Sequence, residues 1–413
     1  MIRVPAFSSR SIIKASGFTA SPRVLAVSNL DLLPQSVPVS LFCAYREPTA
    51  GSFREVVTAF EAKLPSLLDY FLPLAGRIVD NPRSGRPELH CDNQGAELVV
   101  GEVCVALASL DYGHLRVSLA RTGIPIRYGS EIALSVQLVS FACGGFAVAW
   151  GSNHLLVDGY SLCLIANAWS QLVRTGTISA TAVPNHDRSI FWPRSATSYG
   201  SSLGSERAAT RVEAVTAYLW KVFAGVVGAS GESCRMGWWV DGRRRLRSAW
   251  YMEAGMGNYV GNVIAFAVAE ASVEAVLRRP LPEVASMVRE SIKSTATEEH
   301  FQELVDWAGE HKAGKYVQAA TGGPGSPLLA VTSFASFNLD TDFGFGQAVL
   351  AVPTSEGSTR LSCGLLQILA LPGGEGWILS MSVWPKLAAA LDSDGMFKPL
   401  TAEYLGFNQH SRL

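Results

Sequence analysis

Residues 150–160 read Trp-Gly-Ser-Asn-His-Leu-Leu-Val-Asp-Gly-Tyr, and this stretch decides how the rest of the chain can be interpreted. The apolar run from 132 to 150 predicts a strand that delivers His154 at its end. Asp158 and Gly159 follow, and helical spacing begins directly after them. An imidazole at a strand exit, beside a carboxylate and a glycine turn, is suited to general base work near neutral pH.

The pattern His-x-x-x-Asp-Gly is short, and by itself it also fits a buried histidine whose ring nitrogens are satisfied by hydrogen bonds. Its place near the middle of the chain favours the catalytic interpretation, because a cleft between two domains would lie there. Asp158 is expected to hold the loop, since a carboxylate in such a turn readily pairs with an arginine.

Length and composition set the outer bounds. The chain has 413 residues, which predicts two domains of roughly 200 residues each. A content of 48% hydrophobic and 17% charged residues indicates large cores. A formal net charge of −1 gives no reason to expect a nucleic acid partner. The 7 dispersed cysteines show no metal-ligand spacing and indicate reduced thiols in the cytosol.

The sequence predicts no membrane span, because no segment reaches about 18 uninterrupted apolar residues. The first 30 residues contain basic residues and serines but no acid, so they resemble an organelle transit peptide. The alternative, which we favour, is that residues 11–28 form the first strand pair of the fold. Ile12-Ile13 and residues 24–27 are both of β type.

Hydrophobic periodicity predicts the elements along the chain. Helices are expected at 52–71, 160–174, 208–227, 273–279, 282–295, 298–312 and 386–391. Strands are expected at 23–33, 39–45, 89–91, 97–100, 131–142, 146–153, 236–240, 263–268, 328–334, 361–370 and 378–383, and a loop at 321–327. Thr210 and Glu213 form a capping-box pattern at the start of the 208–227 helix.

Residues 175–205 are rich in Thr, Ser, Pro, Gly and Asn and show little periodicity, which indicates a crossover between domains. We therefore divide the chain into an N-terminal domain at 1–175, a linker at 176–207 and a C-terminal domain at 208–413.

A second stretch, residues 338–346, reads Asn-Leu-Asp-Thr-Asp-Phe-Gly-Phe-Gly. Its Gly-x-Gly is a poor phosphate-binding signal, because no strand-to-helix context follows it. Two glycines that flank an aromatic residue are more typical of a tight structural turn.

The two stretches together resemble the paired signatures, HxxxDG and DFGWG, of the plant BAHD acyl-CoA-dependent acyltransferases. The resemblance covers nearly the whole chain. It is supported by four shorter matches, at Ser28-Asn29-Leu30-Asp31, Pro73-Leu74-Ala75-Gly76-Arg77, Val240-Asp241-Gly242-Arg243 and Gly261-Asn262.

The resemblance implies an α/β (α+β) fold of two domains like that of chloramphenicol acetyltransferase. Each domain is a mixed β-sheet flanked by helices, and an active-site channel runs between them. It also implies a monomer that uses acyl-CoA as a co-substrate, with no permanently bound cofactor and no metal. His154 would be the catalytic base, Asp158 would pair with Arg243 or Arg245, and Asn262 would contact substrate. Gly159 and the turn residues Asp342, Gly344 and Gly346 would support the site structurally.

Three departures from the family pattern bear on activity. Phe345 stands where the family usually has Trp, and the segment 246–256 lacks the usual prolines before Gly-Asn. Thr332-Ser333-Phe334 aligns with a Thr-Ser-Trp whose Thr and indole N–H face the reaction centre. Phe334 cannot donate that hydrogen bond. Residues 316–331 contain no basic residue, which disfavours a shikimate-type acceptor.

We therefore expect a cytoplasmic acyltransferase that moves an acyl group, of the hydroxycinnamoyl or benzoyl kind, from acyl-CoA to an alcohol. Thr332 and Phe334 are the expected substrate contacts. Three alternatives stay open: an N-acyltransferase acting on an amine, a catalytically silent BAHD-like partner protein, and a peptide-synthetase condensation domain. The condensation domain has a second histidine where this chain has Asn153.

Overall fold

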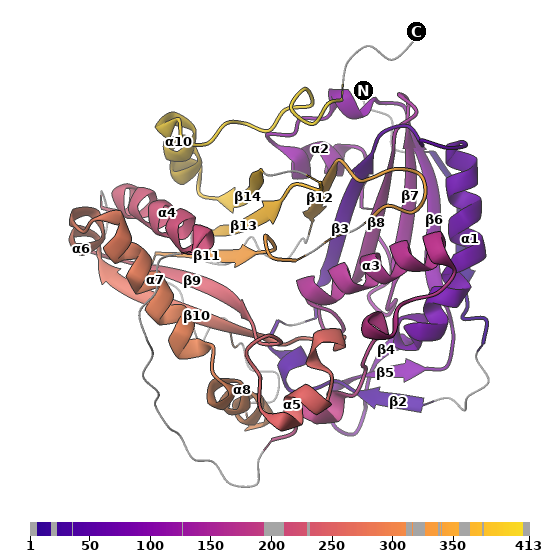
Figure 1. The fold of residues 1–413 in the computed structure, drawn as a ribbon, viewed down its shortest axis with the longest axis horizontal. Coiled ribbons are helices and arrows are strands. Elements are labelled where there is room, and N and C mark those ends of the chain that lie inside the picture. The colour runs from indigo at the N-terminus through magenta and orange to yellow at the C-terminus, as the bar shows by residue number, and fades with distance from the viewer. Residues whose placement is uncertain are drawn as a thin grey trace.

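A computed structural model shows two mixed β-sheets that lie side by side, each with helices packed on its faces (Figure 1). The structure describes residues 6–17, 23–34, 36–125, 127–193, 210–228, 232–310, 316, 327–337, 339, 341–354, 364–373 and 376–407. The predicted loop at 321–327 and residues 194–207 of the predicted linker lie outside these ranges, apart from residue 327.

The first sheet has six strands in the order β1-β6-β7-β8-β3-β12. Only β6 and β7 run parallel, so the sheet is mixed. Helices α1 and α3 contact each other and bury their apolar stripes in the core on this sheet. The elements are β1 (Ala6–Ile13), β3 (Pro38–Tyr45), β6 (Ala96–Val103), β7 (Ser135–Phe141), β8 (Phe146–Asn153), β12 (Leu350–Pro353), α1 (Phe53–Tyr70), α2 (Leu115–Arg121) and α3 (Gly159–Thr175).

The second sheet has five strands in the order β10-β9-β11-β13-β14, with β11 parallel to both of its neighbours. Helices α4, α6, α7 and α10 form one core with it, while α5 and α8 contribute to another. The elements are β9 (Ser233–Asp241), β10 (Ile264–Ser272), β11 (Leu328–Ser333), β13 (Gly364–Ala370), β14 (Trp377–Val383), α4 (Arg211–Val227), α5 (Ala249–Glu253), α6 (Val273–Arg278), α7 (Leu281–Thr295), α8 (Glu298–Glu310) and α10 (Pro385–Asp394).

A smaller sheet, β2-β5-β4, lies below the other two in Figure 1. Its strands are β2 (Arg23–Ala26), β5 (Pro87–Cys91) and β4 (Arg77–Asp80). The predicted strand pair at residues 11–28 is wrong in its pairing: β1 pairs with β6 and β2 pairs with β5. Local β propensity indicates that a strand exists, but its partner is set by contacts distant in sequence.

The capping box predicted at the start of α4 is confirmed. The side chain of Glu213 accepts a hydrogen bond from the backbone N–H of Thr210, and the Thr210 hydroxyl accepts one from the N–H of Glu213. This reciprocal pair satisfies two N–H groups that a helix start would otherwise leave without partners. It fixes the first turn of α4, which lies beside the cavity described below.

The second half of the chain also completes the first sheet. After β11 the chain passes through the second signature and then adds β12 to the edge of β3, with Leu350 opposite Ala44. Phe343 is buried in the core of the first sheet. The two halves are therefore joined by packing as well as by the linker.

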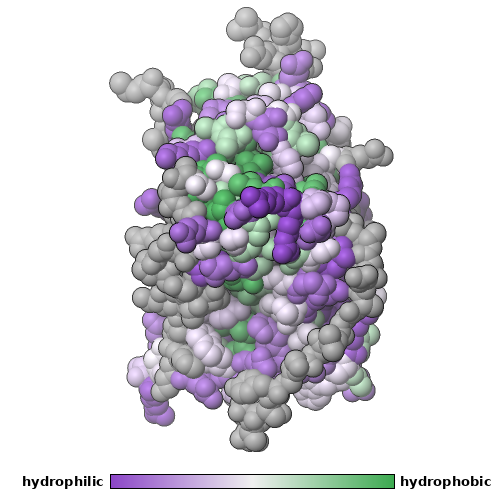
Figure 2. All heavy atoms as spheres, turned by 90° about the vertical axis from the view of Figure 1, so that its left-hand side faces the viewer, coloured by the Kyte–Doolittle hydropathy of each residue, from purple (hydrophilic) through white to green (hydrophobic). Residues whose placement is uncertain are grey.

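Figure 2 shows the face that lies on the left in Figure 1, where helices α4, α6 and α7 cover the second sheet. An apolar area lies in its upper half, with hydrophilic residues directly below it. Among the described residues, no helix combines the length and the apolar composition that crossing a bilayer would need.

Candidate active site

His154 lies in the short turn between β8 and α3. Its backbone N–H donates to the carbonyl of Val37 (2.9 Å), and the next N–H, of Leu155, is accepted by the side chain of Asn153. The strand thus ends where the sequence predicts, and the imidazole is partly buried at that exit. The side-chain NH₂ group of Asn153 also donates a hydrogen bond to the hydroxyl of Ser36.

Asn262 holds the imidazole from the other half of the chain. Its side-chain NH₂ group donates to the backbone oxygen of His154 (2.7 Å) and to the carboxylate of Asp31 (2.9 Å). These two acceptors fix which end of the amide is nitrogen, so Oδ1 is the atom that lies 3.1 Å from Nδ1 of His154. Asn262 is fully buried. The polar side-chain atoms of Asn262 therefore contact His154 and Asp31, whereas the sequence predicts a contact with substrate.

This arrangement sets the tautomer of His154. An amide oxygen can only accept, so Nδ1 must carry the proton and Nε2 is left as the basic nitrogen. Burial lowers the pKa of His154, and the partial compensation by Asp158 and by the bond to Asn262 does not reverse that direction. The ring is therefore neutral at pH 7, which is the state that a general base requires.

Asp31 holds Asn262 in place through hydrogen bonds. It is completely buried, and it accepts hydrogen bonds from the backbone N–H of Ser28 (2.8 Å) and from that of Asn262 (2.8 Å). Arg188 lies 3.4 Å from the same carboxylate and neutralises it. The match of Ser28–Asp31 to the family pattern does not reveal this role, because nothing local in the sequence indicates a contact with residue 262.

Asp158 points into the protein and binds Arg243. The two guanidinium nitrogens lie 2.7 and 3.1 Å from the two carboxylate oxygens, a bidentate pair with both side chains buried. Burial raises the pKa of Asp158, but the charge and hydrogen bonds of Arg243 outweigh this effect and hold the pKa below its usual value. Asp158 also caps α3 through the N–H of Ser161 (2.9 Å). It is thus a structural anchor.

Arg243 joins several segments at once. It also lies 2.8 Å from Asp241, donates to the carbonyl of Gly261 (2.7 Å), and stacks its guanidinium 4.7 Å from the ring centre of Tyr160. Of the two arginines left open by the sequence, Arg243 is the one that contacts Asp158. Arg245 is exposed and donates from Nε to the backbone oxygen of Asp241 (3.2 Å).

Gly159 lets the aromatic ring of Phe334 approach the start of α3. A Cβ added at Gly159 would overlap that ring. Phe334 follows directly after β11, so the close contact joins the His154 turn to the strand that carries Thr332. The expected substrate contacts Thr332 and Phe334 therefore lie beside the first turn of α3.

A cavity of about 410 Å³ lies between the start of α3 and the ends of β9 and β11. This volume is typical of a small-molecule site. Its lining includes the expected residues Asp158, Gly159, Thr332 and Phe334, but not His154 or Asn262. Apolar walls come from strands β9, β10 and β11, from helix α7 and from the loop after β11: Trp238, Trp239, Val240, Ile264, Val331, Ile292 and Phe337.

The second signature forms a structural turn. The carboxylate of Asp342 accepts the backbone N–H groups of Gly344 (2.9 Å) and Gly346 (3.3 Å). Both glycines have positive φ, +86° and +111°, which side chains rarely tolerate. Phe343, which lies between Asp342 and Gly344 in the sequence, packs against Trp150 and Phe60 in the core of the first sheet. Residues 338 and 340 lie outside the described ranges.

Cys163 lies one turn after Gly159 in α3, and a cysteine near the site is a possible nucleophile. It is buried, and burial together with nearby Asp158 raises the pKa of its thiol to about 12. A protonated thiol is a poor nucleophile, so Cys163 is not suited to form an acyl-enzyme. Within the described part of the chain, no His, Cys, Asp and Glu side chains group as metal ligands would.

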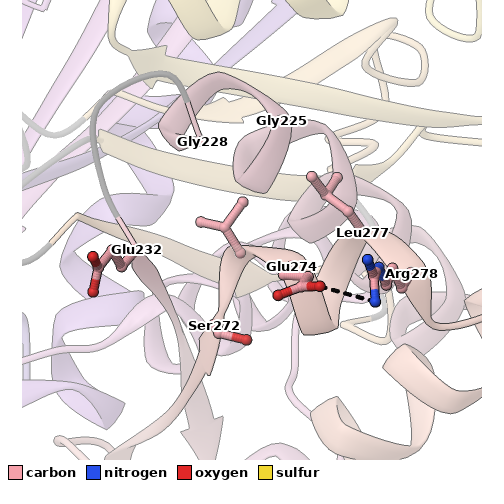
Figure 3. A pocket seen from close by; sticks show the side chains of 8 residues that line it. Gly225, Gly228, Glu232, Ser272, Glu274, Leu277 and Arg278 are labelled. Atoms are coloured by element: carbon pink, nitrogen blue, oxygen red, sulfur yellow. Dashed lines mark ion pairs between the residues drawn. The ribbon is translucent and has the colours of Figure 1, made fainter.

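A second hollow, of about 750 Å³, lies between the end of α4 and helix α6 (Figure 3). Its lining holds neither histidine nor cysteine, and Glu274 and Arg278 in it form an ion pair with each other (2.9 Å). The second hollow therefore contains none of the residues that the sequence predicts for the site.

Comparison with known proteins agrees with the geometry. The model of a family described as "Transferase family" matches residues 6–199 and 194–381. Putrescine hydroxycinnamoyltransferase 3 of Oryza sativa subsp. japonica is 23% identical, over 82% of this chain and 86% of that protein. Vinorine synthase of Rauvolfia serpentina is 26% identical, over 94% and 97%.

Two solved structures show the same fold. The crystal structure of vinorine synthase superposes with a TM-score of 0.68 at 20% identity and covers 98% of both chains. TRI101 of F. sporotrichioides, complexed with coenzyme A and T-2, superposes with a TM-score of 0.74 at 15% identity, over 90% of this chain and 97% of that one. The expected two-domain fold like that of chloramphenicol acetyltransferase is confirmed.

Proposed function

The chain belongs to the plant BAHD acyltransferases, and from that premise we propose that it transfers an aromatic acyl group from coenzyme A to an alcohol, with His154 as the general base. One observation carries the mechanism: the Nδ1 proton of His154 is committed to Asn262, so Nε2 is left as the basic nitrogen. That is the arrangement a base needs before it meets its substrate.

The reaction is a direct transfer between two bound substrates. Nε2 of His154 takes the proton of the acceptor hydroxyl while the oxygen attacks the thioester carbonyl. The tetrahedral intermediate then collapses, the carbon–sulfur bond breaks, and the coenzyme A thiolate takes the proton from the imidazolium. The deprotonated oxygen of the intermediate needs a hydrogen-bond donor. Phe334 has none, so we assign that part to the Thr332 hydroxyl or to a backbone N–H.

The cavity supports an aromatic acyl donor. Trp239, Phe334 and Phe337 supply aromatic walls on which a planar acyl group would stack. Several relatives, among them putrescine hydroxycinnamoyltransferase 3, are named for hydroxycinnamoyl transfer. A hydroxycinnamoyl or benzoyl thioester is therefore the proposed donor.

The charges of the cavity favour a neutral acceptor over a polyamine. A second ammonium group would need a carboxylate, but those in the described lining are engaged: Asp158 and Asp241 with Arg243, and Glu213 with Arg289. Three further arginines in the lining would repel a cation. An alcohol fits best, and an uncharged aromatic amine is the alternative.

We also propose a cytoplasmic monomer. The six described cysteines are all free thiols, which fits a reducing compartment. Both halves contribute to the one site through Asn262, Arg243 and the His154 turn, so a single copy of the chain is sufficient to build it.

The test is a panel of aromatic, acetyl and malonyl thioesters of coenzyme A, each mixed with pools of alcohols, aromatic amines and polyamines, with free thiol measured over time. Thiol release that depends on an aromatic donor and the alcohol pool supports the proposal. Release with the polyamine pool alone would overturn the proposed acceptor. A folded protein that binds coenzyme A but transfers nothing across the panel would support a silent partner instead.

A further inference from the structure

The described part of the predicted linker includes a short 3₁₀ helix, Arg188–Phe191. Just before it, the carbonyl of Asn185 accepts the backbone N–H of Val260 (2.9 Å). The buried ring of Phe191 meets that of Tyr259 edge to face, with 5.4 Å between the ring centres. The linker is therefore fixed beside the segment that leads into β10.

The Arg188 side chain extends from this helix into the interface between the two halves, where it is largely buried. One guanidinium nitrogen donates to the carbonyl of Leu156 (3.1 Å), in the turn after β8. Another donates to the carbonyl of Val260, two residues before Asn262. Nε lies 3.4 Å from the carboxylate of Asp31. One side chain thus contacts the three segments that carry the imidazole, the amide that orients it and the carboxylate that holds the amide.

Gly261 leaves the space that this guanidinium occupies. A Cβ at Gly261 would overlap the Arg188 side chain. On another side the guanidinium lies over the ring of Tyr259, 5.3 Å from its centre. The Gly-Asn pair therefore has two parts: the glycine admits Arg188, and Asn262 binds His154.

Two buried carboxylates act on the imidazole of His154, and each has its own arginine. Asp158 is paired with Arg243, from the turn after β9, and Asp31 is paired with Arg188, from the linker. Burial lowers the pKa of His154, and the charges of Asp158 and Asp31 oppose this effect. A carboxylate that lost its arginine would act more strongly on the ring and would favour the imidazolium.

We propose that Arg188 is a positioning residue of the acyl transfer, which holds the His154 turn against the Asn262 segment and neutralises Asp31, so that the imidazole stays a base. The inference rests on the proposed function, since it concerns the base of that reaction. His186, two residues before Arg188, has no such part. Burial lowers the pKa of His186 to about 3, so it carries no charge at neutral pH.

The experiment compares Arg188→Gln with the charge-preserving Arg188→Lys in the full-length protein. The His154 ring is titrated by NMR of ¹⁵N-labelled histidine, and its signal is assigned by its loss in His154→Ala. Arg188→Gln leaves Asp31 without its arginine, so the pKa of His154 should rise by about one pH unit. Arg188→Lys keeps the charge, so its His154 should titrate as in the wild type.

Acyl transfer gives the second measurement. In Arg188→Gln the acid limb of the kcat profile should move to higher pH by the same interval as the titration, and in Arg188→Lys it should stay in place. A merely structural contact would lower kcat by the same factor at every pH and would not move the profile.

The matched control is Arg289→Gln. Arg289 is another buried arginine, and it lies 3.4 Å from its partner, Glu213. Removing it should destabilise the fold to a similar degree in urea unfolding, because a buried carboxylate again loses its arginine. The titration of His154 should not change.

Two results would overturn the inference. One is an unchanged His154 titration in folded Arg188→Gln. The other is an equal displacement in Arg188→Gln and Arg188→Lys, which would assign the effect to lost contacts and not to charge. If neither variant folds, Asp31→Asn decides: the pKa of His154 should fall, and an unchanged titration would overturn the inference.

The proposed function can fail separately. A wild type that transfers no acyl group would contradict that function, whereas the NMR titration tests the effect of Arg188 on His154 without any substrate.

Discussion

Oδ1 of Asn262 lies 3.1 Å from Nδ1 of His154, although the two residues are 108 positions apart in the chain. Asn262 is itself held by Asp31, from a third segment. The His154 imidazole is thus oriented by residues from both halves of the molecule. Because Asn262 belongs to the other half of the chain, it can hold His154 in one tautomer only when the two halves are packed together.

Asn262→Ala should lower kcat by about ten- to a hundredfold, as is typical when the support of a reactive imidazole is removed. The Nδ1 proton loses its acceptor, so the neutral ring can place its proton on either nitrogen. The KM for acyl-CoA should stay close to the wild-type value, because Asn262 does not line the cavity. Steady-state kinetics of folded protein measure both quantities.

The diagnostic control for this prediction is ¹⁵N NMR of the histidine side chains. In the wild type His154 should show a protonated Nδ1 and a bare Nε2, and in the variant a mixture. An unchanged spectrum together with an unchanged kcat would exclude Asn262 as a positioning residue.

Asp158→Asn should lower the free energy of unfolding at pH 7 by about 3 kcal/mol, since Arg243 would lose its bidentate partner inside the protein. Arg243 lowers the pKa of Asp158 in the folded state, so the charged pair stabilises the fold above the unfolded pKa of about 4. That contribution is lost as the pH falls through the folded pKa. The difference between wild type and variant in urea unfolding should therefore shrink in acid.

Asp241→Asn is the matched comparison. Burial raises the pKa of Asp241, with Arg243 opposing the shift, so its charged form is less favoured. Neutralising it should cost clearly less than neutralising Asp158. Equal costs at pH 7 would contradict the assignment of Asp158 as the main anchor of Arg243.

Gly159→Ala should destabilise the protein by about 1–3 kcal/mol, because the new methyl group overlaps the Phe334 ring. The double variant with Phe334→Ala should recover much of the overlap cost, measured as a coupling energy in urea unfolding. Gly225→Ala in α4 is the control: a Cβ there meets nothing within 4 Å, and helix propensity predicts no loss of stability. Additive effects of Gly159→Ala and Phe334→Ala would show that the two residues do not touch.

Phe343→Ala should cost about 3–5 kcal/mol, as is typical of emptying an aromatic site in a core. Phe345, the residue that replaces the family Trp, is only partly buried against the same core. Phe345→Ala should therefore cost much less and should leave the kcat of the folded enzyme near the wild-type value. A larger loss of stability at Phe345 than at Phe343 would contradict the structural interpretation of this turn.

Much of the fold could be predicted because its signals are local. The helix α4 begins at the predicted capping box, and the β7–β8 hairpin follows apolar runs that are separated by Gly144-Gly145. The short strands β4 and β12 were not predicted. Each has four residues, and such strands are defined by their partners, β5 and β3, more than by their own composition.

In the candidate site, too, the local features could be predicted from the sequence and the contacts distant in sequence could not. The motif indicated His154 and an arginine partner for Asp158, but it could not choose between Arg243 and Arg245. That choice depends on how the turn closes on Gly242, which packs against Phe301 in α8. The contact of Asp31 with Asn262 spans 231 residues, so no local pattern could indicate it.

The most direct test of His154 as the general base is acceptor-dependent release of coenzyme A by His154→Ala, measured at pH 7 with the donor and alcohol that the wild type uses best. Without the imidazole, the acceptor hydroxyl keeps its proton. We predict a fall in kcat of at least about a hundredfold, with coenzyme A binding unchanged. A His154→Ala variant that releases coenzyme A as fast as the wild type would exclude His154 as the base.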